Sequence, residues 1–495
     1  MIKQIFWGIF LLFFNFILPY HLNVESVSGE YKDYNVILII ADALRPDYLG
    51  CYGYAKNVSP NIDTLAYEGV VFTNAFCQIP LTMPSVVSIF TSLYPESHAT
   101  FHVFKDSVPE NVYTLAAILR IYGYQTAWFG SLSDPHTGAG KGVLRGFDTY
   151  RTDANFIREK RKIVGVNFDN IFQWLRQQNK SPIFLVVHTY MPHFGFYPFY
   201  YFRNEFSKKV TDVYKQWREN AMALSEQEAY SEIKEHKENF LGDAEKRTQI
   251  NSTIRGLFKK NFRRRILKLN DEMFHNYLLY LDSAIFEMDR ELIGPLIKEL
   301  QRDNLIKKTI IIITADHGSE QREHRHLGHN VWLYDESIRV PLILYLPGFG
   351  KAKKIDSLVQ SIDILPTTLD LLGIPAPHQT QGMSLVGLID GKEDICGRQY
   401  VFSQSIDGKY MVHTREWKFI DNPIDTMRDE LYNLKKDPKE QDNLIRKNTD
   451  MAKNLQERLL GWKKNLPSYT DNAKQQFVPR IDKETQERIR RTGYW

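Results

Sequence analysis

Cysteine is scarce in this chain: Cys51, Cys77 and Cys396 are the three among 495 residues. Their odd number and wide spacing exclude a disulfide framework, and at most one bridge can form. Long apolar runs are scarce as well. Beyond the N-terminal segment, none reaches the ~18 residues that a membrane-spanning helix needs, so the sequence predicts no span after that segment.

Charge of one sign is not in excess either. The 63 Lys and Arg side chains barely outnumber the 59 Asp and Glu, which leaves a formal charge of +4 on 58.0 kDa. Such a balance provides no large excess of positive charge for binding nucleic acid, so we expect no nucleic-acid partner. The apolar share of 43% and charged share of 25% are those of a globular protein, which excludes a collagen, a coiled-coil rod and a disordered chain.

The N-terminal segment, residues 1–28, differs from the rest of the chain. Lys3 precedes an apolar run from Ile5 to Tyr20, the pattern of a secretory signal peptide and short for a spanning helix. An uncleaved membrane anchor is the alternative. Either way the sequence predicts an exported protein, periplasmic or secreted, or held to a membrane by this segment.

Buried strands alternate with amphipathic helices in the first three quarters of the chain. Nearly continuous apolar runs rich in β-branched residues are typical of strands covered on both faces of a parallel sheet. These strands are expected at residues 34–41, Ile183–Val187, Thr309–Ile313 and Val340–Leu346, with helices at Val112–Tyr122 and Ala284–Gln301. The pattern predicts an α/β fold with a large, mostly parallel sheet flanked by helices.

Two regions depart from that pattern. Residues 201–270 are highly charged and are predicted to form a helical insertion in a catalytic domain spanning 33–381. Its basic run, Ile254–Lys268, is either a solvated helix face or a site for an anionic polymer or lipid head groups. Residues 382–475 are expected to form a C-terminal subdomain, a small antiparallel sheet with the helix Met451–Lys464, followed by a loose tail at 476–495.

Polar residues at two strand ends indicate a metal site. The strand 34–41 is followed by Asp42, and the strand 309–313 is followed by Thr314-Ala315-Asp316-His317-Gly318. Ligands in α/β sheets gather at the carboxyl ends of the strands. Two carboxylates and an imidazole side by side there would hold a divalent cation with mixed oxygen and nitrogen ligands.

These motifs and others in the same order resemble the sulfatase family of the alkaline-phosphatase superfamily, over roughly residues 33–465. The resemblance implies an alkaline-phosphatase-like fold and an anionic-ester hydrolase. The segments that carry it are Asp42–Gly53, Pro84-Ser85 with Thr91–Pro95, Gly123–Thr126, Arg145–Asp148, Met191–His193, Ala315–Gly318, Leu333–Glu336 with Arg339–Leu342, Ser361–Thr367, Trp417-Lys418 and Glu430–Leu434.

The family's nucleophile box departs from its pattern here. Sulfatases carry a Cys or Ser that becomes formylglycine, followed by x-Pro-x-Arg, whereas this chain reads Thr82-Met83-Pro84-Ser85-Val86. Threonine cannot form formylglycine, so none is expected. Thr at this position resembles the phosphodiesterases and transferases of the superfamily, in which a threonine alkoxide attacks phosphorus. The alternative is that Thr82 only caps the following helix.

The resemblance also implies a metal and further site residues. The predicted ligands are Asp42, Thr82, Asp316 and His317. Because Ala43 stands where calcium sulfatases have a second acid, Zn²⁺ or Mn²⁺ is favoured and Ca²⁺ is the alternative. His193 and His329 are predicted to be catalytic beside Thr82, and Arg45, His102 and His324 are predicted to bind substrate. Ser131 stands where many relatives have a lysine.

The sequence therefore predicts an exported, metal-dependent hydrolase that cleaves a sulfate, phosphate or phosphonate ester through Thr82. Its partner would be a small-molecule, glycan or lipid anionic ester. Two alternatives stay open: a transferase of the phosphoethanolamine or glycerophosphate type, and an inactive binder of anionic glycans. The sequence does not indicate an oligomeric state.

Overall fold

The computed structural model describes residues 29–102, 105–130, 141–151, 158–159, 162–163, 168–178, 181–193, 204–234, 257–258, 260–350, 352–391 and 397–469. The predicted signal or anchor at 1–28 and the tail at 476–495 lie outside them. In this described part of the chain, no helix combines the length and hydrophobicity needed to cross a membrane. Cys51 and Cys77 are both free thiols.

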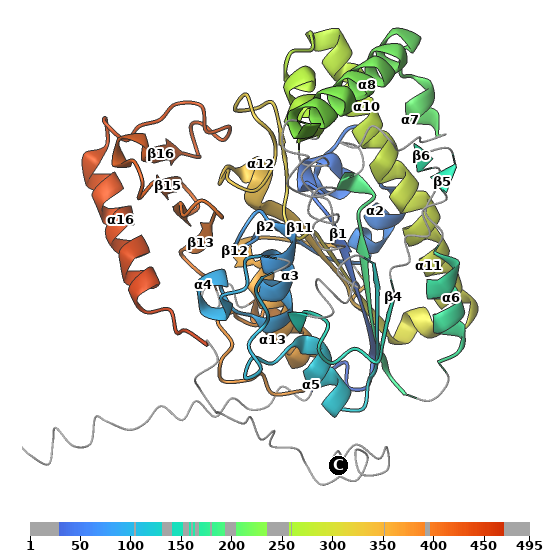
Figure 1. Cartoon of the computed structure of the whole chain (residues 1–495). Coiled ribbons are helices and arrows are strands. Elements are labelled where there is room, and N and C mark those ends of the chain that lie inside the picture. Colours follow the sequence, from blue (N-terminus) through green and yellow to red (C-terminus); the bar gives the residue numbers. More distant parts are fainter. Residues whose placement is uncertain are drawn as a thin grey trace, which may run out of the picture.

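An eight-stranded sheet forms the centre of the molecule (Figure 1). Its order is β12-β2-β11-β8-β1-β7-β3-β4, and β11 runs antiparallel to both neighbours while the other pairs are parallel. The strands are β1 (Asn35–Ala41), β2 (Gly69–Phe76), β3 (Gln125–Gly130), β4 (Thr149–Arg151), β7 (Ile183–Thr189), β8 (Thr309–Thr314), β11 (Arg339–Tyr345) and β12 (Lys353–Gln360). The predicted mostly parallel sheet is confirmed.

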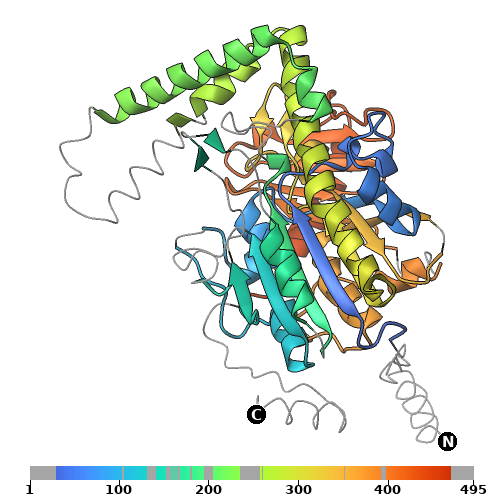
Figure 2. The same ribbon diagram turned by 90° about the vertical axis from the view of Figure 1, so that its right-hand side faces the viewer.

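Helices cover both faces of this sheet, which is why every residue of β1 is buried. One face carries α3 (Thr82–Thr91), α5 (Leu115–Ile121) and α13 (Ile364–Leu371), with α4 (Pro95–His98) beside α3 (Figure 1). The other carries α2 (Pro60–Tyr67), α6 (Asp169–Arg176), α10 (Asp271–Met288) and α11 (Gly294–Arg302) (Figure 2). The predicted helix Ala284–Gln301 is the end of α10, a π-helical turn at Asp289–Ile293, and α11.

The C-terminal part forms the second sheet that the sequence predicts. Strands β13 (Val401–Gln404), β14 (Tyr410–His413), β15 (Trp417–Asp421) and β16 (Glu430–Asn433) pair antiparallel in that order. Helix α16 (Thr449–Lys464) packs Ala452, Leu455 and Leu459 onto the sheet. The short helix α12 (Asp335–Ile338) precedes β11, and the short helix α14 (Val386–Ile389) packs against β12 and α13.

The described part of residues 201–270 contains helices. It holds α7 (Glu205–Lys208), α8 (Asp212–Lys234) and helical residues at 257–258 and 260–267. Helix α8 lies beyond one end of the sheet and extends away from it (Figure 2). Two short hairpins, β5 (Arg158–Glu159) with β6 (Lys162–Ile163) and β9 (Glu320–Gln321) with β10 (Leu327–Gly328), lie outside both sheets.

Candidate active site

Three neighbouring strands bring polar side chains to one edge of the central sheet. In β1, Ile40 is level with Thr314 of β8 on one side and with His188 of β7 on the other. Asp42 follows β1 directly, and Asp316 lies just beyond β8. Strand register therefore places these two acids together with His188 at the carboxyl edge.

Asp42, His188, Asp316 and His317 form one buried cluster, in which all four side chains are fully buried. The Nε2 atom of His188 lies 4.0 Å from Asp42 Oδ2 and 3.9 Å from Asp316 Oδ2. The Nε2 atom of His317 lies 3.8 Å from Asp42 Oδ1 and 3.5 Å from Asp316 Oδ2. The structure thus brings the three predicted strand-end ligands together.

Backbone hydrogen bonds orient the ligand atoms of this cluster. Asp316 Oδ1 accepts the N–H of Ala43 at 3.2 Å and that of His317 at 2.9 Å, and the buried Oδ2 makes no hydrogen bond with any residue that the structure describes. His317 Nδ1 donates to Gly318 O at 2.9 Å, which turns Nε2 toward the carboxylates. A backbone acceptor on the far nitrogen is the usual support of a metal-binding histidine.

His188 belongs to the cluster although the sequence analysis did not select it. Burial lowers its pKa to about 4, in spite of nearby Asp316, so the ring is neutral at pH 7 and offers a lone pair. The signal was present, because His188 stands near the end of a buried strand just as Asp42 does. His188 directly follows the predicted strand Ile183–Val187, so the rule that selects Asp42 applies to it as well.

Thr82 faces this cluster from the first residue of α3. Its Oγ1 lies 3.3 Å from His317 Nε2, the ring nitrogen that faces the carboxylates. The N-cap position is held by Leu81, and no side chain caps the helix. The alternative that Thr82 is a helix cap is therefore wrong. Ser85, one turn on, donates its hydroxyl to Asp316 O and ties α3 to the strand end.

His193 and His329 meet at the rim of the cluster. Their Nε2 atoms are 3.3 Å apart, and His193 Nε2 lies 4.0 Å from Asp42 Oδ1. His329 stacks on His317 at 4.1 Å between ring centroids. Its Nδ1 donates to Pro80 O at 3.1 Å, and its pKa is lowered by burial and then by His317, His193 and Arg263. Neutral His329 therefore accepts at Nε2, and His193 donates its Nε2–H.

The cluster fits a divalent cation. Two buried carboxylates side by side are costly without a compensating positive charge, and among the described residues the Oδ2 of Asp316 has no hydrogen-bond partner. Two carboxylates with two imidazoles form a donor set that suits Zn²⁺ or Mn²⁺ better than Ca²⁺, which takes ~6–8 oxygens. Asp42, His188 and Asp316 already place one ligand atom each within 4.8 Å of one another.

The structure does not bring the three predicted substrate-binding residues into this cluster. Arg45 is buried, and its guanidinium binds Asp47, the carbonyl of Ser319, and Glu323 at 2.6 Å. Through these contacts Arg45 holds the segment after β8 in place. His102 is exposed, and its backbone N–H donates to Asp106.

His324 lies in a second polar group, next to the C-terminal sheet. Its Nδ1 is 3.2 Å from Glu320 Oε2 and 3.9 Å from Glu336 Oε2. Its Nε2 is 3.1 Å from Lys439 O and 3.2 Å from Glu440 O. Because both ring nitrogens face only acceptors, both carry a proton and the ring is an imidazolium.

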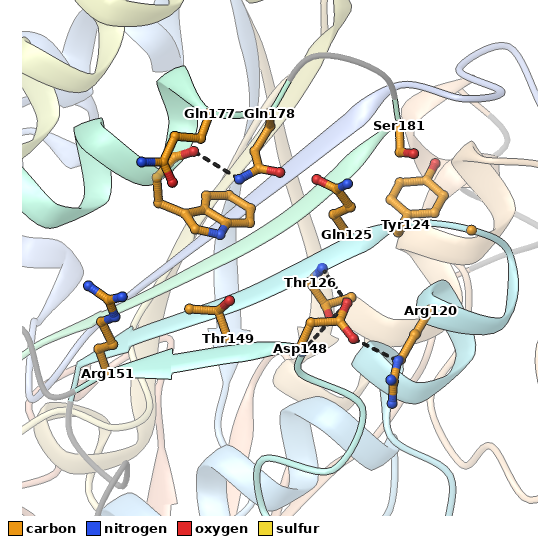
Figure 3. A pocket seen from close by; sticks show the side chains of 12 residues that line it. Arg120, Tyr124, Gln125, Thr126, Asp148, Thr149, Arg151, Gln177, Gln178 and Ser181 are labelled. Carbon is orange, nitrogen blue, oxygen red and sulfur yellow. Dashed lines mark hydrogen bonds and ion pairs between the residues drawn. The ribbon is translucent and has the colours of Figure 1, made fainter. Parts of the chain in front are cut away.

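A pocket of about 460 Å³ opens away from this cluster, beside the amino end of β3 and the edge strand β4 (Figure 3). Asp148, on its wall, binds Arg120 at 2.8 Å and Thr126. Arg151 and Gln125 point into the same space (Figure 3). None of the predicted catalytic or metal-binding residues lines this pocket.

Curated relatives resemble this chain over most of its length. A delta 4,5-hexuronate-2-O-sulfatase of Bacteroides thetaiotaomicron is 26% identical over 434 residues, covering 83% of this chain and 84% of that protein. Arylsulfatase K of Rattus norvegicus is 26% identical over 477 residues, covering 90% and 81%.

Solved structures share the fold. The phosphonate monoester hydrolase of Agrobacterium radiobacter superposes with a TM-score of 0.65 at 20% identity, covering 91% of this chain and all (100%) of that one. A protein in complex with its substrate D-glucosamine-2-N,6-O-disulfate superposes with a TM-score of 0.61 at 21% identity, covering 88% and 98%.

Two family models match the sequence. The one described as N-sulphoglucosamine sulphohydrolase, C-terminal, matches residues 323–465. The sulfatase model matches residues 34–374, which hold Asp42, Thr82, Asp316 and His317. The chain therefore belongs to the sulfatase family of hydrolases.

Proposed function

We propose that this protein is an exported, metal-dependent hydrolase that cleaves a singly charged sulfate or phosphorus ester through Thr82. The observation that carries the proposal is the Thr82 hydroxyl, 3.3 Å from His317 Nε2 and beside two buried carboxylates. The relatives named hexuronate sulfatase and arylsulfatase support an ester of an anionic glycan or small molecule.

The side chains divide the chemistry among them. Asp42, His188, Asp316 and His317 would hold the cation, which when bound supplies positive charge that favours an ionised Thr82 hydroxyl and an anionic ester. Thr82 Oγ1 attacks sulfur or phosphorus in line with the leaving oxygen. Because α3 begins at Thr82, its first backbone N–H groups also favour an anion there.

The histidine pair supports His193 as the proton donor. His193 carries its proton on Nε2 and points it toward His329, whose own proton is held by Pro80 O. A leaving-group oxygen that arrives between the rings takes the Nε2 proton from His193 in its imidazolium form, which leaves a neutral ring, and water then hydrolyses the ester on Thr82. His329, kept neutral by its surroundings, accepts a proton from that water.

The charge of the site favours a monoanionic ester. Val86 is buried and apolar where the family box has an arginine, so that positive group is missing. Sulfate monoesters, phosphodiesters and phosphonate monoesters carry one negative charge at pH 7, whereas phosphate monoesters carry nearly two. Beside Asp42 and Asp316, the second charge of a phosphate monoester is unfavourable.

Turnover of four p-nitrophenyl substrates tests the proposal: the sulfate, the phenylphosphonate, the methyl phosphodiester and the phosphate monoester. We expect activity on at least one monoanionic ester, lost in Asp316→Ala together with the bound metal measured by mass spectrometry. Asp363→Asn is the control. Asp363 is as buried as Asp316, but its carboxylate pairs with Arg398 and does not belong to the cluster. Full metal content in Asp316→Ala would contradict the assignment.

A further inference from the structure

Helix α6 packs on β3 and leaves the edge strand β4 partly open. The ring of Trp174 in α6 lies 6.1 Å from that of Phe129 in β3, measured between centroids. Because Phe129 is level with Arg151 and Ala127 with Thr149, these two β4 side chains project from the face that carries α6. Thr149 is half-buried and Arg151 is exposed. The pocket of about 460 Å³ lies between them and the end of α6 (Figure 3).

Three glutamines and a tryptophan are among the side chains that line this pocket. Gln125 and Gln177 are exposed, and Gln178 donates its Nε2–H to Trp174 O at 3.0 Å, which leaves its Oε1 to accept. A carboxamide both donates and accepts hydrogen bonds, as the hydroxyl groups of a sugar also do. Trp174 is half-buried and adds an apolar ring. This combination suits a sugar ring, which carries hydroxyl groups at its edge and C–H groups on its faces.

The charged groups of the lining leave the pocket positive. Arg120 and Asp148 pair at 2.8 Å, so their charges offset each other. Arg151 forms no ion pair with an acid among the described residues, and its exposed guanidinium points into the pocket (Figure 3). A guanidinium binds a carboxylate or a sulfate group through two parallel N–H donors. The lining therefore favours a sugar that carries an acidic group.

The pocket and Thr82 lie on different faces of the central sheet. Trp128 precedes Phe129 in β3 and therefore points to the opposite face. Its ring lies 5.6 Å from that of Phe90 in α3 and 5.6 Å from that of His188. Thr82 begins α3, so the proposed nucleophile belongs to that opposite face. A ligand held between β4 and α6 is thus separated from Thr82 by the sheet.

We propose that this pocket is a second binding site, which takes an acidic sugar such as a uronate or a sulfated hexose. Arg151 binds the acidic group, Trp174 packs against the sugar ring, and the glutamine amides bind its hydroxyl groups. A volume of about 460 Å³ lies within the roughly 300–1,000 Å³ of small-molecule sites. The inference goes beyond the proposed function, because this site holds an anionic glycan without cleaving it.

Calorimetric titration with methyl β-D-glucuronide and with methyl β-D-glucoside tests this without turnover. The two sugars differ only at C6, where the first has a carboxylate and the second a hydroxymethyl group. We expect the wild type to bind the glucuronide about tenfold more tightly, the effect of one charge-assisted contact. Arg151→Gln should remove that preference, and Trp174→Ala should weaken the binding of both sugars about fivefold.

Arg176→Gln is the matched control and should keep the wild-type preference. Arg176 also lies on α6, but it pairs with Glu299 and does not line the pocket. Equal or undetectable binding of both sugars by the wild type, or an unchanged preference in Arg151→Gln, would overturn the inference. Should Trp174→Ala not fold, the exposed Arg151 still decides. Because no step here needs ester cleavage, failure of the proposed function is read separately, from the p-nitrophenyl substrates.

Discussion

Replacing His324 by Gln should remove one pH-dependent contribution to the free energy of unfolding of this protein. The imidazolium joins Glu320 and Glu336 to the backbone carbonyls of Lys439 and Glu440, so it links the segment after β8 to the C-terminal sheet. Gln at position 324 can donate to one of these acceptors but carries no charge.

The size and the sign of the effect follow from the pKa of His324. Burial opposes the charged ring, but the hydrogen bond and the charges of Glu320, Glu336 and Glu440 raise its pKa to about 9. An unfolded imidazole has a pKa of about 6.5. Protonation in the folded state therefore contributes about 3 kcal/mol below pH 6.5, declines as the pH rises, and is lost above about pH 9.

Urea unfolding of wild type and His324→Gln at pH 6, 7.5 and 9, followed by tryptophan fluorescence, measures this. The variant should be less stable by about 3 kcal/mol at pH 6 and by under about 1 kcal/mol at pH 9. His326→Gln is the control, because burial and then the charges of His324 and Lys409 lower the pKa of His326. Because a lowered pKa destabilises the fold at low pH, His326→Gln should be more stable relative to the wild type at pH 6 than at pH 9.

A destabilisation of His324→Gln that is equal at pH 6 and pH 9 would refute the reasoning. Such a result would mean that the variant loses packing against Tyr334, whose ring stacks 3.7 Å from that of His324, rather than a charge.

Three further predictions concern the site and the C-terminal sheet. Thr82→Ala should fold with a loss of no more than about 1 kcal/mol, yet lower turnover by several orders of magnitude; an active variant, or a covalent adduct found by mass spectrometry on another peptide, would contradict a Thr82 nucleophile. His188→Gln should lower metal affinity at least tenfold in a competition titration with a chelator, and unchanged affinity would remove His188 from the ligands. Lys418→Met should cost about 3–5 kcal/mol in urea unfolding, because it leaves the buried Glu440 and the partly buried Asp335 without their cation; a neutral result would show that these acids are protonated in the variant.

The sequence by itself determined the sheet and half of the site. Runs such as 34–41 are so apolar that a strand covered on both faces is the arrangement that buries them, and a polar residue after such a strand must lie at the sheet edge. Asp42, Asp316 and His317 followed from that rule. Thr82 followed from the resemblance of its box.

Tertiary structure decided which residues contact one another in the site. His188 joined the cluster because β7 pairs with β1 in one register, and His193 met His329 across 136 residues of sequence. The ring of His324 faces the carbonyls of Lys439 and Glu440 rather than the predicted site. Contacts of this kind depend on how distant elements pack and on where each side chain finds its hydrogen bonds, which no local pattern of residues encodes.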